Sequence, residues 1–175
     1  MKRFADIESN ELVWDQPKHF RMEYELRAGD ELLATLVWEK PTGSLAHATT
    51  ADGEWTFKRG GFLRPHVNIR IPGNSDDLAA MEINLSGAGT LRFTEGAIYR
   101  WLSTSFWTGA WEFVTDDKTP LIRFRNPQMI GQAKGTIILE EAASESTRTP
   151  LLACLGWYLL ILMAADTVNQ NVIIS

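Results

Sequence analysis

Cysteine is almost absent from this chain of 175 residues, and its shortage excludes two common ways of holding a small protein together. Cys154 is the single cysteine, so an intrachain disulfide cannot form and a cysteine-based zinc site lacks its ligands. The three histidines, His19, His47 and His66, share no metal-ligand spacing and lie near no pair of carboxylates in the sequence. We therefore expect no metal and no cofactor. We also expect a cytoplasmic protein, because that compartment keeps thiols reduced.

Signatures of catalysis are missing as well. The chain contains no G-x-S-x-G, no H-E-x-x-H and no P-loop, since "GQAKGT" does not follow the G-x-x-x-x-G-K-[ST] order. Cys154 lies within an apolar run, whereas a catalytic thiolate needs an accessible, positive setting. We expect a protein that is not an enzyme. The first residues, "MKRFADIESNELVWD", have no apolar run after the basic pair, so a signal peptide is not expected.

Acidic residues outnumber basic ones, with a formal net charge of −5, but they are absent from two stretches of the chain. The net acidity argues against nucleic acid as a partner, because phosphate binding needs a positive field. The two stretches run from Trp55 to Ser75 and from Lys118 to Leu139. Their basic residues include six candidates for an anion-binding or lipid-binding face: Lys58, Arg59, Arg64, Arg70, Arg123 and Arg125.

A single basic face would form if these two stretches adjoin in the fold. It could then hold phosphate or the head group of an anionic lipid, phosphoinositides included. The alternative is a solvated strand face whose charges pair with Glu82, Glu112 or Asp116, because surface ion pairs are common and individually weak. Both interpretations stay open on the sequence alone.

Residues 19–140 form a series of short amphipathic segments with a period of two. Examples are "FRMEYELR", "GEWTFKR", "HVNIRI", "AMEINL", "TLRFT", "AWEFV" and "LIRFR", in which apolar residues alternate with polar ones. Gly, Asp, Asn and Pro lie between the segments, as in "ADGE" and "TDDKTP", and mark tight turns. The pattern predicts about ten to twelve strands in one mainly β domain that spans residues 1–175, with 1–18 as an N-terminal segment.

A helix is predicted over residues 149–167, with Thr149 as the N-cap and Pro150 as the first helical residue. The run from Leu151 to Ala165 carries no charge and has no polar face. At ~1.5 Å per residue it reaches roughly 22 Å, which is short for a ~30 Å hydrocarbon layer. We therefore expect no transmembrane span and place residues 150–166 inside a closed barrel, which would otherwise be too wide to fill. A tail-anchored membrane protein remains the alternative.

Three stretches resemble the tubby C-terminal-like superfamily, which includes tubby proteins, phospholipid scramblases and plant LURP-one-related proteins. They are "LLACLGWYLLILMAAD", "ADGEWTFKRGG" and "GAIYRWLSTSFWTGAWEF". The resemblance implies a twelve-stranded antiparallel barrel closed around a hydrophobic central helix. It also implies a non-enzymatic module that binds phosphoinositides and tethers proteins to membranes. The calcium loop, the cysteines and the Pro-rich region of scramblases are absent from this chain.

Most of the seven tryptophans are expected where the barrel wall meets the helix: Trp38, Trp55, Trp101, Trp107, Trp111 and Trp157. Trp14 lies outside the regular pattern and could cap the barrel. The first functional hypothesis is a non-catalytic tethering module for an anionic lipid or a protein partner, peripheral at a membrane in the lipid case. The second is a structural or regulatory protein that works by self-association.

Overall fold

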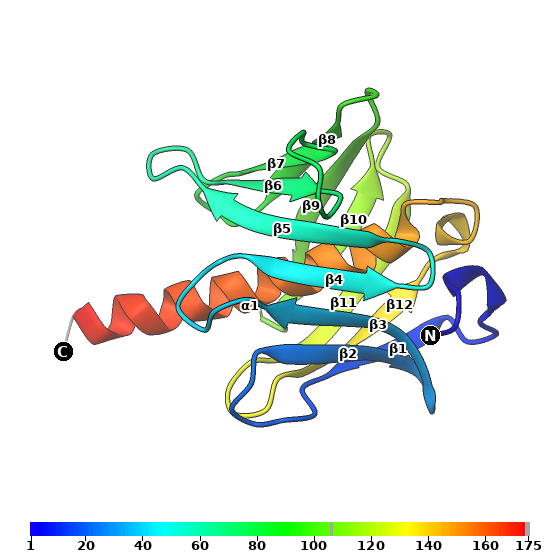
Figure 1. Ribbon diagram of the computed structural model, residues 1–175, viewed down its shortest axis with the longest axis horizontal. Helices are drawn as coiled ribbons and strands as arrows, with labels where there is room; N and C mark the ends of the chain where they lie inside the picture. The colour runs from blue at the N-terminus through cyan, green and yellow to red at the C-terminus, as the bar shows by residue number, and fades with distance from the viewer. Residues whose placement is uncertain (106, 174–175) are drawn as a thin grey trace.

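The computed structural model describes residues 1–105 and 107–173, which form a twelve-stranded β-barrel around one long helix (Figure 1). The strands are β1 (Glu11–Asp15), β2 (Glu23–Ala28), β3 (Glu31–Trp38), β4 (Ala46–Thr50), β5 (Glu54–Gly60), β6 (His66–Arg70), β7 (Ala79–Ile83), β8 (Gly89–Phe93), β9 (Ile98–Ser105), β10 (Ala110–Thr115), β11 (Pro120–Gln128) and β12 (Lys134–Leu139). The helices are the 3₁₀ turns η1 (Phe4–Asp6) and η2 (Glu141–Ala143) and the α-helix α1 (Thr149–Ile173).

Every strand pairs antiparallel with its neighbours along the chain, and β1 pairs with β12 to close the barrel. In the closing pair Glu11 lies opposite Ile138 and Asp15 opposite Lys134. Because direction alternates from strand to strand, successive loops lie at opposite ends of the barrel. The predicted mainly β, closed, twelve-stranded barrel is confirmed.

Helix α1 occupies the barrel interior, as predicted. All fourteen residues from Thr149 to Leu162 are buried, and at ~1.5 Å per residue they cover about 21 Å of the barrel axis. Residues 149–170 are long and apolar enough to cross a membrane by length and composition, but most of that segment, residues 149–162, is buried inside the protein. The helix continues to Ile173 instead of ending near residue 167, and its last turns project from the barrel (Figure 1).

Two glycines allow the helix to sit close to the barrel wall. A Cβ atom on Gly156 would lie 2.1 Å from Cζ of Phe124 on β11. A Cβ atom on Gly135 of β12 would lie 2.8 Å from Cζ3 of Trp157 on the helix. Both positions lack room for any side chain, so the absence of a side chain sets the distance between helix and wall.

Aromatic rings fill the space between helix and wall. Trp14 stacks on Trp157 with ring centroids 5.7 Å apart, and Trp38 stacks on Tyr158 at 5.2 Å. Trp14 is therefore a lumen residue of β1, and the idea that it caps the barrel from outside the pattern is wrong. Trp107 also corrects the prediction, because its side chain is completely exposed in a loop.

The strand boundaries differ from the prediction in three respects. Strand β1 lies within the segment expected to precede the barrel, and β4 ("AHATT") was missed because its small residues give a weak period-two signal. Phe20 and Leu85, assigned to strand faces by alternation, lie beyond strand ends and are exposed.

The start of α1 also differs from the prediction that Thr149 caps the helix. The Thr149 hydroxyl donates to the Ala143 carbonyl (2.6 Å), so its partner is η2 and not a helix N–H.

Candidate functional site

The two ends of the barrel differ sharply in chemistry. The exit end, where α1 leaves the barrel, is made of residues 16–22, 39–45, 61–65, 84–88, 107–109 and 129–133. The base end, where α1 begins, is made of residues 1–10, 29–30, 51–53, 71–78, 94–97, 116–119 and 140–148. Each set follows from the strand order, because alternate loops of an up-and-down barrel share one end.

Large apolar side chains project into solvent from the exit-end loops. Six of those that the structure describes are between 89% and 106% exposed, and we call them the apolar tips: Phe20, Phe62, Leu63, Leu85, Trp107 and Ile130. At the base end, Met1 and Ile71 are only about half exposed, at 52% and 49%. Single exposed apolar residues are normal, whereas six gathered at one end make that end the candidate site.

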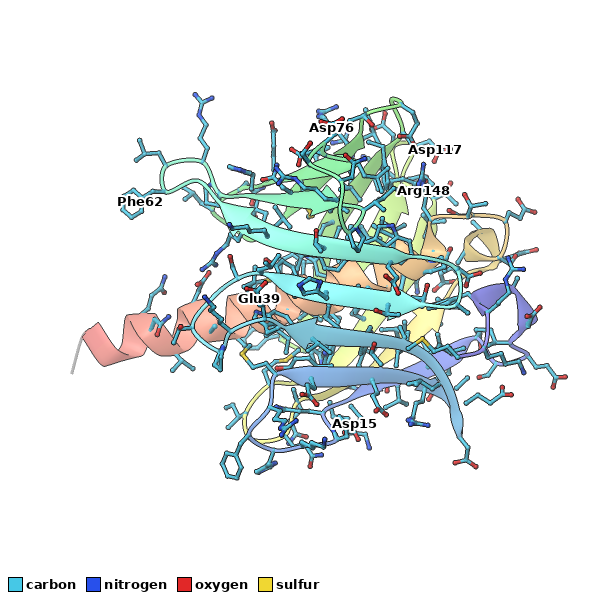
Figure 2. The ribbon with its side chains drawn as sticks, in the orientation of Figure 1. Asp15, Glu39, Phe62, Asp76, Asp117 and Arg148 are labelled. Carbon is cyan, nitrogen blue, oxygen red and sulfur yellow. The ribbon has the colours of Figure 1, made fainter. Side chains whose placement is uncertain are left out.

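Charge is also divided between the ends. The exit-end loops carry four basic residues, Lys18, Arg21, Lys40 and Arg64, and one acidic residue, Glu39. The base-end segments carry twelve acidic residues and four basic ones. The net charge of −5 is therefore unevenly distributed: the base end is strongly negative and the exit end is positive. Figure 2 shows Phe62 pointing away from the barrel on the side where α1 projects, with Asp117 and Arg148 toward the other end.

The six predicted site residues do not form one face. The first stretch lies on β5 and β6, and the second contributes β11, which is six strands from β5 in either direction around the barrel. Lys58, Arg59 and Arg64 lie at or near the exit end, and Arg125 lies on the wall toward that end. Arg70 is at the base end of β6. The two basic stretches therefore do not adjoin in the described structure, and they do not form the single basic face.

Two of the candidates are engaged in ion pairs on the barrel wall. Arg70 binds Asp77 at 2.6 Å, and this hydrogen bond is the main reason why the pKa of Asp77 lies below its ordinary value. Arg123 lies 3.1 Å from Glu140 and 3.4 Å from Glu112. These are the solvated wall pairs of the alternative interpretation, with Asp77 and Glu140 as partners that the sequence did not indicate.

Arg59 contacts α1 through both its side chain and its backbone. Its guanidinium pairs with Asp166 of the emerging helix at 2.6 Å. Its backbone N–H donates to the Tyr158 hydroxyl (3.0 Å), which donates in turn to the carbonyl of Ser44 (2.6 Å). Burial raises the pKa of Tyr158 above its ordinary value, so this hydroxyl keeps its proton and can donate. The network ties β5, the β3–β4 loop and α1 together at the exit end.

A pocket of about 530 Å³ adjoins Arg59 at the exit end, between α1 and the β5–β6 and β7–β8 loops. A second pocket, of about 640 Å³, lies at the base end beside the start of α1. The base-end pocket is lined by five carboxylates, at positions 8, 52, 140, 141 and 145, and one basic residue, Arg3, so its net charge is negative and disfavours an anion. The exit-end pocket is mainly apolar, with Arg59 and Asp166 at its rim.

The Cys154 thiol is enclosed by the barrel. Burial raises the pKa of the Cys154 thiol far above its ordinary value, which leaves it protonated inside the barrel. No group of three or more His, Cys, Asp or Glu side chains could hold a metal within residues 1–105 and 107–173.

The apolar tips were missed by sequence reasoning, although a signal was present. Phe62 and Leu63 stand between two glycines and "RP", and Leu85 stands between Asn84 and Ser86, in segments rich in turn-forming residues. Turn segments rarely need large apolar residues for folding, so these positions could have been noted as exposed.

Comparison with known proteins adds no relative. No family model matches the chain, no curated protein matches it, and no solved structure matches it. The resemblance to the tubby C-terminal-like superfamily therefore remains a hypothesis, and the function is argued from the exit end of the barrel.

Proposed function

We propose that this protein is a non-catalytic tethering module that places the exit end of its barrel on a membrane surface rich in anionic phospholipids. The observation that carries the proposal is the coincidence of the apolar tips with the positive end of the molecule. The tips come from five of the six exit-end loops, one or two per loop, around a closed ring of strands. Side chains spread around a ring suit a broad, flat apolar layer better than a narrow peptide.

The energetic terms at the exit end favour this contact. Burial of a large apolar side chain contributes up to about 1.5–3 kcal/mol, and partial insertion at an interface contributes a fraction of that. A basic residue near an anionic membrane contributes about 1 kcal/mol. Lys18, Lys40 and Arg64 have no ion pair among the described contacts, whereas Arg21 lies 3.4 Å from Glu23. Several weak terms together are enough for reversible peripheral binding.

The negative base end does not prevent binding. The buried part of α1 separates the two ends by about 21 Å. At physiological salt the Debye length is about 8 Å, so base-end charges are largely screened at the membrane. Their remaining repulsion favours the orientation in which the exit end faces the lipid.

Vesicle flotation tests the proposal. We expect recovery of the protein with phosphatidylcholine vesicles that contain phosphatidylserine or a phosphoinositide, and much lower recovery with phosphatidylcholine alone. Raising the salt concentration should reduce recovery, because counterions screen the basic residues. Equal recovery with neutral and anionic vesicles would refute the electrostatic part of the proposal.

Variants at the two ends sharpen the flotation test. The double variant Phe62→Ser and Leu85→Ser should lower recovery, because it removes two apolar tips whose side chains are fully exposed. The double variant Lys40→Gln and Arg64→Gln should also lower it. Ile71→Ser, an exposed apolar residue at the base end, is the matched control and should leave recovery unchanged. Loss of binding in the control alone would show that the wrong end was chosen.

Self-association is the second candidate function, and the opposite charges of the two ends favour it in a head-to-tail arrangement. Against it, the described base end offers only two half-exposed apolar residues to meet the apolar tips. Light scattering across a range of protein concentrations decides between the two. A monomer at every concentration removes the second candidate, and concentration-dependent growth abolished by Lys40→Gln and Arg64→Gln would support it.

A further inference from the structure

The pocket at the exit end has an apolar floor that continues onto the proposed membrane-facing surface. Its volume is about 530 Å³. Its apolar side chains come from two loops, one strand end and the emerging helix: Phe62, Ile83, Leu85, Leu159, Leu162 and Met163. Phe62 and Leu85 are also apolar tips, so the pocket opens directly among them.

Arg59 supplies a fixed positive charge at the rim of this apolar pocket. Its backbone N–H donates to the Tyr158 hydroxyl (3.0 Å), and this bond fixes the position from which the side chain extends. Its guanidinium carries five N–H donors, and the described contacts assign one nitrogen of the group to Asp166, at 2.6 Å. The side chain remains about one-third exposed, so it can bind a second anion without leaving its place.

We infer that this pocket binds the alkyl chain of a single-chain anionic amphiphile and that Arg59 binds its carboxylate or phosphate group. A volume of about 530 Å³ lies within the ~300–1,000 Å³ range of small-molecule sites. An anionic head group is favoured because Asp166, the acidic side chain that lines the pocket, is already paired with Arg59, whose other N–H donors can bind a second anion. The inference rests on the proposed function only in taking the exit end as the part of the protein that meets lipid.

Calorimetric titration with dodecanoate below its micelle concentration tests the inference without vesicles. We expect one dodecanoate per chain, bound at least about tenfold more tightly than dodecyltrimethylammonium, which has the same chain and the opposite charge. Butyrate, which keeps the carboxylate but lacks the long chain, should also bind at least about tenfold more weakly. Failure of dodecanoate to bind, or equal binding of the cationic analogue, would overturn the inference. Dodecyl phosphate in place of dodecanoate compares the two head groups.

Four variants locate the site. Thr167→Trp places a bulky side chain at the exposed rim of the pocket and should abolish dodecanoate binding. Val168→Trp, on the next residue of the helix and outside the pocket lining, is the matched control and should bind normally. Arg59→Gln should weaken binding about tenfold, whereas Asp166→Asn should strengthen it by removing a competing carboxylate. Normal binding by Thr167→Trp would place the ligand elsewhere and contradict the inference.

The two proposals can fail separately. Protein that floats with anionic vesicles but does not bind dodecanoate refutes the pocket and leaves the membrane contact intact. Protein that binds dodecanoate but does not float with vesicles refutes the membrane contact and leaves the pocket intact.

Discussion

Replacing Gly156 with alanine tests whether the helix is enclosed by the barrel. On an exposed helix this change stabilises by about 0.8–1.0 kcal/mol, because alanine is the better helix former. Inside the barrel the new methyl group would lie 2.1 Å from Cζ and 2.5 Å from Cε2 of Phe124. That ring cannot yield easily, since it packs edge-on against Trp101 with centroids 5.2 Å apart.

The expected result is a net loss of stability. Overpacking of a filled core costs about 1–3 kcal/mol, and a contact this short belongs at the upper end of that range. After subtraction of the propensity gain, we expect the free energy of unfolding to fall by about 1–2 kcal/mol in urea titrations. The matched control is Ala165→Gly, an exposed position beyond the barrel, where only the loss of propensity of about 1 kcal/mol should appear.

A second substitution identifies Phe124 as the obstacle. Phe124→Leu removes the ring atoms nearest to the new methyl group, so in that background Gly156→Ala should cost less than in the natural sequence. A gain in stability of about 1 kcal/mol from Gly156→Ala alone would refute the reasoning, because it would mean that this face of the helix has free space around it.

Three further predictions concern the lumen. Tyr158→Phe should lower the free energy of unfolding by about 1–3 kcal/mol in urea titrations, because it leaves the Arg59 N–H and the Ser44 carbonyl without their partner. Burial raises the pKa of Tyr24 from 10.0 to about 12 in the folded state. Between about pH 10 and pH 12 the unfolded chain loses this proton while the folded protein keeps it, so the free energy of unfolding should fall over that range. Tyr24→Phe should remove part of this fall in alkaline unfolding curves. Cys154 should resist a polar thiol reagent in the native protein and react fully in denaturant, and rapid native labelling would contradict its enclosure.

The barrel and its central helix could be predicted because two strong physical signals agree. The run from Leu151 to Ala165 has no polar face, and the strands before it form a wall that needs filling. The helix end could not be predicted, since the polar residues after Asp166 continue the helix into solvent instead of stopping it. The close approach at Gly156 was also invisible, because it depends on which ring faces that residue.

The exit end could not be assigned from the sequence because the end on which a loop lies depends on counting strands. If β1 or β4 is missed, every later loop is assigned to the opposite end. The charges of the two ends are then mixed, and only the net charge of the whole chain can be read. The basic candidates were chosen as two stretches of sequence, and the barrel separates them onto opposite walls. Lys58, Arg59 and Arg64 nevertheless lie together at the exit end, because a strand and its following loop remain adjacent in any fold.

An environment-sensitive fluorophore on one end of the barrel tests the central claim most directly. Phe62→Cys places a reactive thiol on an apolar tip, and Asp117→Cys places one at the base end, while the natural Cys154 is buried and should remain unlabelled (Figure 2). On addition of phosphatidylserine-containing vesicles, the emission of the label at position 62 should shift to the blue and that at position 117 should not change. An unchanged spectrum at position 62 in protein that floats with the vesicles would contradict the claim that the exit end meets the membrane.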